Sequence, residues 1–480
     1  MTSWSQTPWH RHQQCHPDRV ALHFCNTQGE EQTFTWQQLC CHIDQYQAAL
    51  LLYGMKAGDV LTLVGKNHIQ MLLWVLAAQQ AGIVCAFAMP QSASQLTDKL
   101  NTLYAPSQTA YVWLAESDQC LADDFKDIGR KIQFIDPISS DDQHHPWQRQ
   151  LQYRNDNLAS IIFTSGSTGN PKAVVHNHEQ HFASAQGLLD AFCFQAGDTW
   201  LLSLPMFHVS GLAIIYRWLY SGACLKIGSG NVAIDIQGVT HASLVATQLK
   251  RLLDSKQRLT LSHVLLGGSH IPHELGLQAA KLGIETWLGY GMTEAASTVT
   301  AKRVDATATT GKVLAQRRVK LDGERIYIGG NTLAQGYYYQ GVVTPIVDDQ
   351  GWYDSKDLGR WLEDELLIIG RADNLFTSGG ENVHCEEIEA ILNQQPEVQL
   401  AMVVPVKDDE FGARPVAVIR SGRAFLKSDG DAYLQGKLEK FKWPIAYFPM
   451  PDELTESGIK VSRKAVKDWL ADHQHQFIPY

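Results

Sequence analysis

Short apolar runs rich in β-branched and aromatic residues alternate with segments of helical periodicity through the first 300 residues of this chain. Helical periodicity covers residues 33–53 and 68–82, whereas residues 60–64 and 83–87 have the length and composition of buried strands. The same alternation continues through residues 183–192, 200–204, 211–221, 223–227, 243–254, 264–266 and 284–288. Such alternation predicts an α/β fold of stacked layers with largely parallel sheets.

The pattern changes twice in the last third of the chain. From about residue 310, strand-like runs at 317–321, 325–328 and 366–369 lie between Gly- and Asp-rich turns, which favours a small β-barrel subdomain over about 310–372. A helix at 386–393 and strands at 400–406 and 415–419 then predict a compact α+β unit. We therefore expect an N-terminal domain over 1–372 and a C-terminal α+β domain over 373–480.

Composition excludes several classes of protein. With 480 residues, 45% of them hydrophobic and 19% charged, the chain is expected to form two or three globular domains. A net charge of −10 argues against general nucleic-acid binding. The nine cysteines form no CxxC pair, so we expect reduced thiols in a cytoplasmic protein and no zinc site. Polar residues interrupt both long apolar stretches, 71–90 and 201–227, so no membrane span is predicted.

One string of residues predicts a phosphate site. Residues 161–172 read IIFTSGSTGNPK, which is a strand-like run followed by a turn full of hydrogen-bond donors and a lysine, Lys172. Backbone N–H groups, hydroxyls and one ammonium can together surround a polyphosphate. No Gly-Lys-Ser/Thr ends the string and Pro171 would interrupt a helix, so it is not a Walker A loop. A Ser- and Gly-rich surface loop is the alternative.

The string closely resembles the phosphate-binding signature of the acyl-adenylate-forming superfamily, which includes acyl- and aryl-CoA ligases, luciferases and peptide-synthetase adenylation domains. In that family the loop holds the β- and γ-phosphates of ATP while a carboxylate attacks the α-phosphate. The resemblance covers roughly residues 20–470, with the motifs in family order. It implies ATP and Mg²⁺ as cofactors, and it gives nucleotide-binding roles to Thr164, Ser165, Gly166, Ser167, Thr168, Gly169 and Lys172.

Two more strings each follow an expected strand, at residues 266–269 (LGGS) and 287–294 (WLGYGMTE). Loops beyond the carboxyl ends of parallel strands are where α/β folds bind ligands. The resemblance implies that the first loop, with Gly267 and Gly268, lines the adenine and acyl pockets.

The second of these strings, GYGMTE, could in isolation be only a turn. By resemblance, Tyr290 packs on adenine beside Gly291, Thr293 meets the α-phosphate, and Glu294 helps to hold the Mg²⁺ ion. The metal would neutralise the polyphosphate so that a carboxylate can approach phosphorus.

The string WYDSKDLG at 352–359 resembles the next family motif. Asp357 would accept hydrogen bonds from the ribose hydroxyls, and Arg371 would contact ribose or phosphate; a strand-end salt bridge is the alternative for both. Asp373 falls where the family has its hinge. Gly379 and Gly380 would then line a pantetheine tunnel, unless they form an ordinary turn.

Residues 454–463 resemble the terminal catalytic-lysine motif, which implies a mobile C-terminal domain and assigns the catalytic role to Lys460. A lysine there can stabilise charge between the attacking carboxylate and the α-phosphate. The sequence departs from the family pattern at Ala173, at Phe163, and at Ile459, an extra residue that shifts the register of this lysine.

The segment from 203 to 222 bears on the substrate. His208 and Ser210 would flank the acyl site, although a lone histidine among apolar residues is more often structural. Arg217 lies among apolar neighbours, where a guanidinium is costly unless paired. It is either part of an internal salt bridge or the counter-ion of a second carboxylate on the substrate.

This segment, like residues 458–464, resembles the o-succinylbenzoate–CoA ligases of menaquinone biosynthesis. The resemblance implies ATP-dependent ligation of o-succinylbenzoate to coenzyme A through an acyl-AMP, with release of AMP and pyrophosphate. The residues it makes catalytic are Lys172, His208, Glu294 and Lys460. Another aryl- or acyl-CoA ligase, such as a benzoate-type enzyme, and a non-catalytic ATP- or acyl-AMP-binding relative remain as alternatives, and homo-oligomerisation stays open.

Overall fold

The computed structural model describes residues 6–25, 30–119, 121–124, 130–136, 151–164, 172–267, 273–456 and 461–473. Within these ranges, no helix is both long enough and apolar enough to cross a membrane. The eight cysteines that the structure describes are all free thiols.

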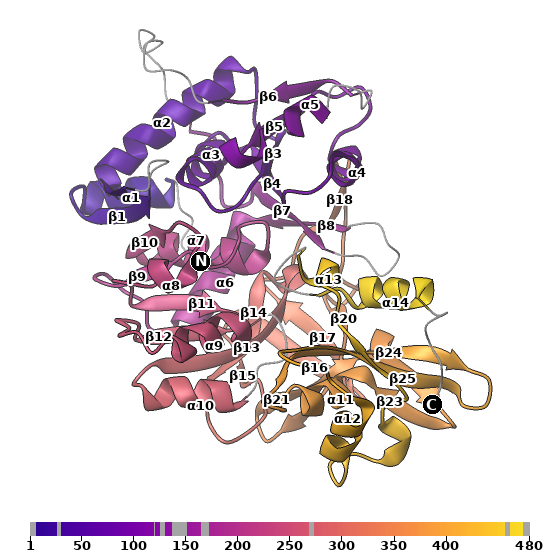
Figure 1. The fold of residues 1–480 in the computed structure, drawn as a ribbon. Helices are drawn as coiled ribbons and strands as arrows, with labels where there is room; N and C mark the ends of the chain where they lie inside the picture. The colour runs from indigo at the N-terminus through magenta and orange to yellow at the C-terminus, as the bar shows by residue number, and fades with distance from the viewer. Residues whose placement is uncertain are drawn as a thin grey trace.

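An eight-stranded sheet contains the ends of the expected phosphate loop (Figure 1). Its order is β19 (Val342–Thr344), β18 (Gly336–Tyr339), β8 (Lys172–Asn177), β7 (Leu158–Thr164), β4 (Val84–Ala88), β3 (Val60–Val64), β5 (Ala110–Leu114) and β6 (Ile132–Phe134). The strands from β7 to β6 are parallel, whereas β8, β18 and β19 join antiparallel. The β7–β8 hairpin therefore opens at the carboxyl end of a parallel strand.

A second, nine-stranded sheet contains most of the remaining strands of the expected large domain. Its order is β15 (Lys312–Val313), β14 (Ser297–Arg303), β13 (Glu285–Met292), β12 (His263–Leu266), β11 (His241–Leu244), β9 (Thr199–Leu201), β10 (Cys224–Ile227), β1 (Val20–Cys25) and β2 (Glu31–Thr35). The strands from β13 to β1 are parallel, and antiparallel strands close both ends.

Helices fill the layer between the two sheets, and further helices cover their outer faces. The buried layer contains α3 (Ile69–Gln80), α6 (His178–Leu189) and α7 (Val209–Ser221); α6 contacts β8 of one sheet and β14 of the other. The outer helices include α4 (Ala93–Leu103) on the eight-stranded sheet, and α9 (Ala246–Asp254) and α10 (His273–Lys281) on the nine-stranded sheet. The prediction of stacked α/β layers is confirmed.

The helix expected over 33–53 begins later, because residues 31–35 pair with β1 instead. In α2 (Trp36–Leu52), the Thr35 side chain accepts from the Gln38 N–H and the Gln38 side chain accepts from the Thr35 N–H. This reciprocal cap fixes the start of the helix at the end of the strand.

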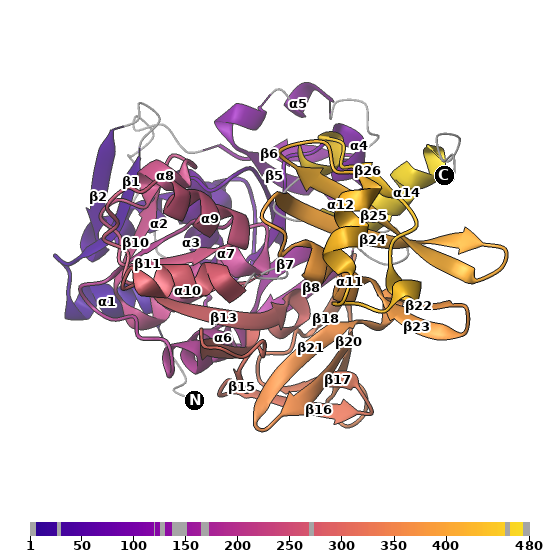
Figure 2. The same ribbon diagram turned by 60° about the horizontal axis from the view of Figure 1, so that its bottom comes forward.

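The last third of the chain forms two further sheets (Figure 2). Antiparallel strands β16 (Arg317–Asp322), β17 (Arg325–Gly330), β20 (Tyr353–Leu362) and β21 (Glu365–Arg371) make the β-rich subdomain. Strands β22 (Leu375–Ser378), β23 (Glu381–His384), β24 (Val398–Asp408), β25 (Gly412–Ser421) and β26 (Tyr447–Pro449) follow, with helices α11 (Cys385–Leu392), α12 (Lys427–Leu434), α13 (Glu453–Glu456) and α14 (Arg463–Asp472). This α+β unit has hydrophobic clusters of its own. The boundary at 372–373 stays a prediction.

Candidate active site

The ends of the phosphate loop are placed by strand pairing. Thr164 ends β7 and Lys172 begins β8, and the two residues face each other in the antiparallel register of the hairpin. Ser165, Gly166, Ser167, Thr168 and Gly169, together with Gly268 and Lys460, lie outside the described residues. Since paired residues of an antiparallel ladder point to the same face, Thr164 and Lys172 share one side of the sheet.

Next to the end of the phosphate loop, Tyr337 contacts both Glu294 and Lys172. Glu294 lies in the short 3-10 helix Thr293–Ala295, directly after β13. The Tyr337 hydroxyl of β18 donates to Glu294 Oε1 at 3.2 Å, and the Lys172 Nζ lies 4.8 Å from the centre of the Tyr337 ring. Burial, and then the charge of Glu294, raise the pKa values of Tyr337 and Tyr353. Both tyrosines are thus neutral, and Tyr337 is a donor to the carboxylate.

Asp357 forms the other side of the site. It pairs in register with Arg371 across β20 and β21, is only 7% exposed, and accepts from Arg371 Nη1 at 3.1 Å. The Tyr290 hydroxyl donates to Asp357 Oδ2 at 2.6 Å. Burial and the Asp357 charge raise the Tyr290 pKa well above its ordinary value. Arg371 Nη2 also donates to Asp373 Oδ2 at 3.2 Å.

These two groups of contacts form one continuous cluster. Tyr290, Tyr353 and Ala295, the residue after Glu294, pack in one hydrophobic cluster, which joins the glutamate side to the aspartate side. Lys172, Glu294 and Asp357 come from three different elements, which are β8, the 3-10 helix and β20. Their roles in nucleotide binding stay predictions. Tyr337 and Tyr353 were missed as candidates, although the run Tyr337-Tyr338-Tyr339 and the string WYDSKDLG contained the signal.

Helix α7 carries the residues expected at the acyl site. His208 is its N-cap residue, and the His208 ring lies 4.9 Å from that of Phe207. Ser210 lies in the first turn and is half-buried. Gly267 directly follows β12, so both the helix start and this glycine lie beyond carboxyl ends of strands of the nine-stranded sheet.

Arg217 points into the protein from the same helix. It is 2% exposed, its Nη1 lies 3.5 Å from Ser243 Oγ, and its guanidinium lies 5.3 Å from the centre of the Trp200 ring. Nε lacks a hydrogen-bond partner, and no ion pair to Arg217 forms among the described residues. Burial lowers the Arg217 pKa to about 9. The expected alternative, an internal salt bridge, is thus not seen in the described part of the chain.

The two glycines expected to line a tunnel have an evident local role. Gly379 (φ 57°) and Gly380 (φ 90°) form the two-residue turn between β22 and β23. Positive φ at both positions of a two-residue hairpin turn requires glycine or a similar residue. The turn alone therefore explains why both positions are glycine. A contact of these glycines with coenzyme A stays a prediction.

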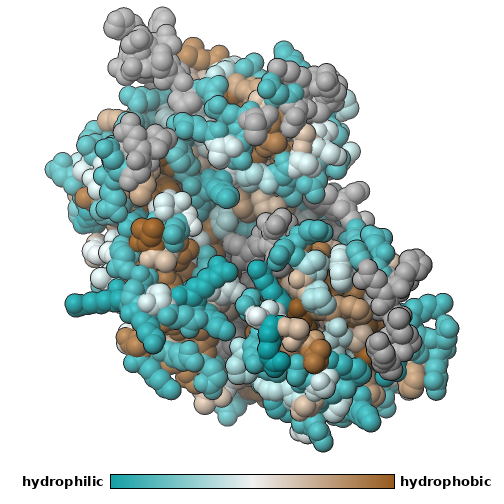
Figure 3. Space-filling model, viewed as in Figure 1, coloured by the Kyte–Doolittle hydropathy of each residue, from teal (hydrophilic) through white to brown (hydrophobic). Residues whose placement is uncertain are grey.

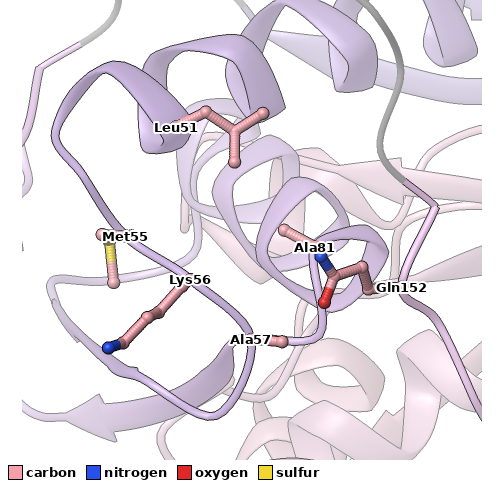
Figure 4. A pocket seen from close by; sticks show the side chains of 6 residues that line it. All are labelled: Leu51, Met55, Lys56, Ala57, Ala81 and Gln152. Carbon is pink, nitrogen blue, oxygen red and sulfur yellow. The ribbon is translucent and has the colours of Figure 1, made fainter.

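One small pocket lies apart from these residues, near the ends of α2 and α3 (Figure 4). Its volume is about 50 Å³, and it is lined by Leu51, Met55, Lys56, Ala57, Ala81 and Gln152. This space suits water rather than a nucleotide, since ligand pockets are several times larger. Figure 3 shows a largely hydrophilic face with scattered hydrophobic residues.

Comparison with known proteins agrees with this geometry. The model of the AMP-binding enzyme family matches residues 9–338. This chain belongs to that family.

Two curated relatives of this AMP-binding enzyme match over nearly their full length. The 2-succinylbenzoate–CoA ligase of Haemophilus influenzae is 41% identical over 95% of this chain and 96% of its own length. The ligase of the same name from Salmonella typhimurium is 38% identical over 98% and 99%. Among solved structures, a variant of Escherichia coli MenE with bound OSB-AMS is 35% identical, covers 97% of this chain and 98% of its own, and has a TM-score of 0.86.

Proposed function

We propose that this AMP-binding enzyme ligates 2-succinylbenzoate (o-succinylbenzoate) to coenzyme A, a step of menaquinone biosynthesis, and releases AMP and pyrophosphate. The names of its full-length relatives support the substrate. The observation that carries the proposal is the buried guanidinium of Arg217, which has no carboxylate partner among the described residues. A buried unpaired charge is costly, and a substrate with a second carboxylate would remove that cost on binding.

The substrate fits this requirement because 2-succinylbenzoate is an aromatic dicarboxylate. One carboxylate reacts, and the other must remain free throughout the reaction. Arg217 would pair with the unreactive carboxylate, directly or through water, and thereby orient the succinyl carboxylate toward ATP. His208 and Ser210, at the start of the same helix, would flank the reacting end together with Gly267 and Gly268.

The cluster of charges and tyrosines is suited to a nucleotide. Asp357 would accept hydrogen bonds from the ribose hydroxyls, with Arg371 holding the carboxylate in place, and Tyr290 would pack beside adenine next to Gly291. Thr293 would meet the α-phosphate. Lys172 would act with the phosphate loop on the β- and γ-phosphates.

Glu294 fits a magnesium ion. Magnesium in nucleotide sites is usually held by one or two carboxylates together with phosphate oxygens and water. Among the described residues, no cluster of three or more His, Cys, Asp or Glu forms a protein-only metal site, so the phosphates would supply further ligands. When bound, the ion neutralises phosphate charge, while Tyr337 orients the Glu294 carboxylate.

The reaction then has two steps. The succinyl carboxylate attacks the α-phosphate of ATP, with the developing charge stabilised by Lys460, and acyl-AMP and pyrophosphate form. The C-terminal domain, 373–480, would next rotate about Asp373, which removes Lys460 and brings Gly379 and Gly380 to the site. The thiol of coenzyme A attacks the mixed anhydride, and AMP leaves.

A pyrophosphate-release assay with a panel of carboxylic acids tests the proposal. We expect release with 2-succinylbenzoate, thioester formation when coenzyme A is added, and much weaker use of benzoate. Preference for benzoate would indicate another aryl-CoA ligase, and ATP binding without release would indicate a non-catalytic relative. Cytoplasmic location and homo-oligomerisation stay predictions, for cell fractionation and light scattering to test.

A further inference from the structure

Asn67 joins the two halves of the large domain at the acid side of the site. It follows β3 of the eight-stranded sheet, but its side chain bonds to the segment that joins β9 of the nine-stranded sheet to α7. Nδ2 donates to the carbonyls of Leu202 at 3.0 Å and Leu204 at 2.8 Å, and Oδ1 accepts from the Met206 N–H at 2.9 Å. One amide therefore holds three alternate residues of the segment.

The segment that Asn67 holds leads directly to the acid-binding residues. His208 follows Met206 by two positions and is the N-cap residue of α7. Within the segment, the Ser203 hydroxyl donates to the Ser243 carbonyl, and the Ser243 hydroxyl accepts from Arg217. A shift of residues 202–206 would thus move both the start of α7 and the hydroxyl that faces Arg217.

We propose that Asn67 is a positioning residue for the acid substrate, which fixes residues 202–206 so that His208 and Arg217 hold their places. The inference rests on the proposed function, because it assigns these two residues to the acid. An amide is suited to the task, since it offers two donors and an acceptor in one plane without adding charge. Supporting bonds of this kind matter because a misplacement of about 1 Å can lower a rate by about 100-fold.

Comparing the effects of an Asn67 substitution on the use of the acid and on the use of ATP distinguishes a positioning role from a general role in folding. The described residues expected to hold ATP lie on β7, β8, β13, the 3-10 helix Thr293–Ala295, β20 and β21. None of the Asn67 hydrogen bonds reaches these elements. Loss of the Asn67 amide should therefore weaken use of the acid and leave use of ATP almost unchanged.

The experiment measures pyrophosphate release by Asn67→Ala with the acid varied at saturating ATP, and then with ATP varied at saturating acid. We expect kcat/KM for the acid to fall about 10- to 100-fold, while KM for ATP changes by less than about twofold. Asn67→Asp keeps the size and the acceptor but loses both donors, so it should show the same pattern as Asn67→Ala.

Asn393 is a matched control in the C-terminal part of the chain. Its Nδ2 donates to the Glu389 carbonyl at 2.8 Å and the Ala401 carbonyl at 3.4 Å, and its Oδ1 accepts from the Ala401 N–H at 2.8 Å. Asn393→Ala loses the same pattern of bonds, so urea unfolding should show a similar loss of stability, with both KM values unchanged.

Three results would overturn the inference: equal changes in both KM values for Asn67→Ala, kinetics like those of Asn393→Ala, or failure of both Asn67 variants to fold, which would make the residue structural. Failure of the wild-type protein with 2-succinylbenzoate would instead refute the proposed function. The same comparison would then use whichever acid of the panel the wild-type protein adenylates.

Discussion

Replacing Arg217 by methionine should separate substrate recognition from folding. The side chain is 2% exposed, and its described contacts are one long hydrogen bond to Ser243 and a cation–π contact with Trp200. The hydrogen bond is long, the cation–π contact offsets only part of the cost of burying the charge, and methionine fills most of the same volume without a buried charge. We therefore expect the free energy of unfolding of Arg217→Met to stay within about 1 kcal/mol of the wild type, or to rise.

The activity of Arg217→Met with 2-succinylbenzoate should decrease even though its stability does not. If Arg217 pairs with the unreactive carboxylate, its loss removes a charge-assisted hydrogen bond of about 1.5–3 kcal/mol. This corresponds to a decrease in kcat/KM for 2-succinylbenzoate of about 10- to 150-fold, measured by pyrophosphate release at saturating ATP. Use of a monocarboxylic acid such as benzoate should be affected far less, since no second carboxylate is present.

Arg317 provides the matched control. Its guanidinium is also buried, but Nη1 donates to the Ala315 carbonyl at 2.8 Å, and Nη2 donates to both the carbonyl and the hydroxyl of Ser184 at 2.9 Å. Arg317→Met leaves these acceptors unpaired and should lower the free energy of unfolding by about 2–4 kcal/mol. If Arg217→Met is destabilised as much as Arg317→Met, with unchanged preference between the acids, Arg217 is structural and the reasoning is wrong.

Three more predictions concern the C-terminal domain and pH. Lys460→Ala should abolish ATP–pyrophosphate exchange but keep thioester formation from supplied acyl-AMP; equal loss of both activities would exclude the proposed role. Asp373→Pro should do the reverse, because it stiffens the expected hinge, and unaffected thioester formation would refute that hinge. His176 and His178 are buried, and burial lowers their pKa values to about 3. Because the unfolded chain binds protons below about pH 6.5 and these folded histidines do not, the free energy of unfolding should fall between about pH 6.5 and pH 3, by up to about 1.4 kcal/mol per pH unit for each. Urea unfolding at pH 7 and pH 5 checks this, and His176→Phe should reduce the slope; an unchanged slope would contradict the assignment.

Much of the fold was predictable from local patterns. Periodicity and turn residues act over a few positions and were enough to predict three features. These are the strand at residues 60–64, the helix within 68–82 and the change from alternating helices and strands to short strands after residue 310. The predicted helix at 33–53 was wrong at its start, because pairing of residues 31–35 with β1 overrides the helical pattern there. The paired residues are only 6 to 15 positions apart, but β1 lies outside the segment that has helical periodicity.

The sequence by itself indicated that the strings at 161–172 and 287–294 each follow an apolar strand of an α/β fold, and loops beyond the carboxyl ends of parallel strands are where such folds bind ligands. That these residues bind a nucleotide stays a prediction. Only the tertiary structure decided which side chains contact one another. It joins Tyr290 and Arg371 to Asp357, keeps Arg217 without an ion pair among the described residues, and brings Asn67 to a segment that begins 135 positions later in the chain. The physical reason is that strand order and helix packing set distances between side chains, and neither is written in the spacing of residues along the chain.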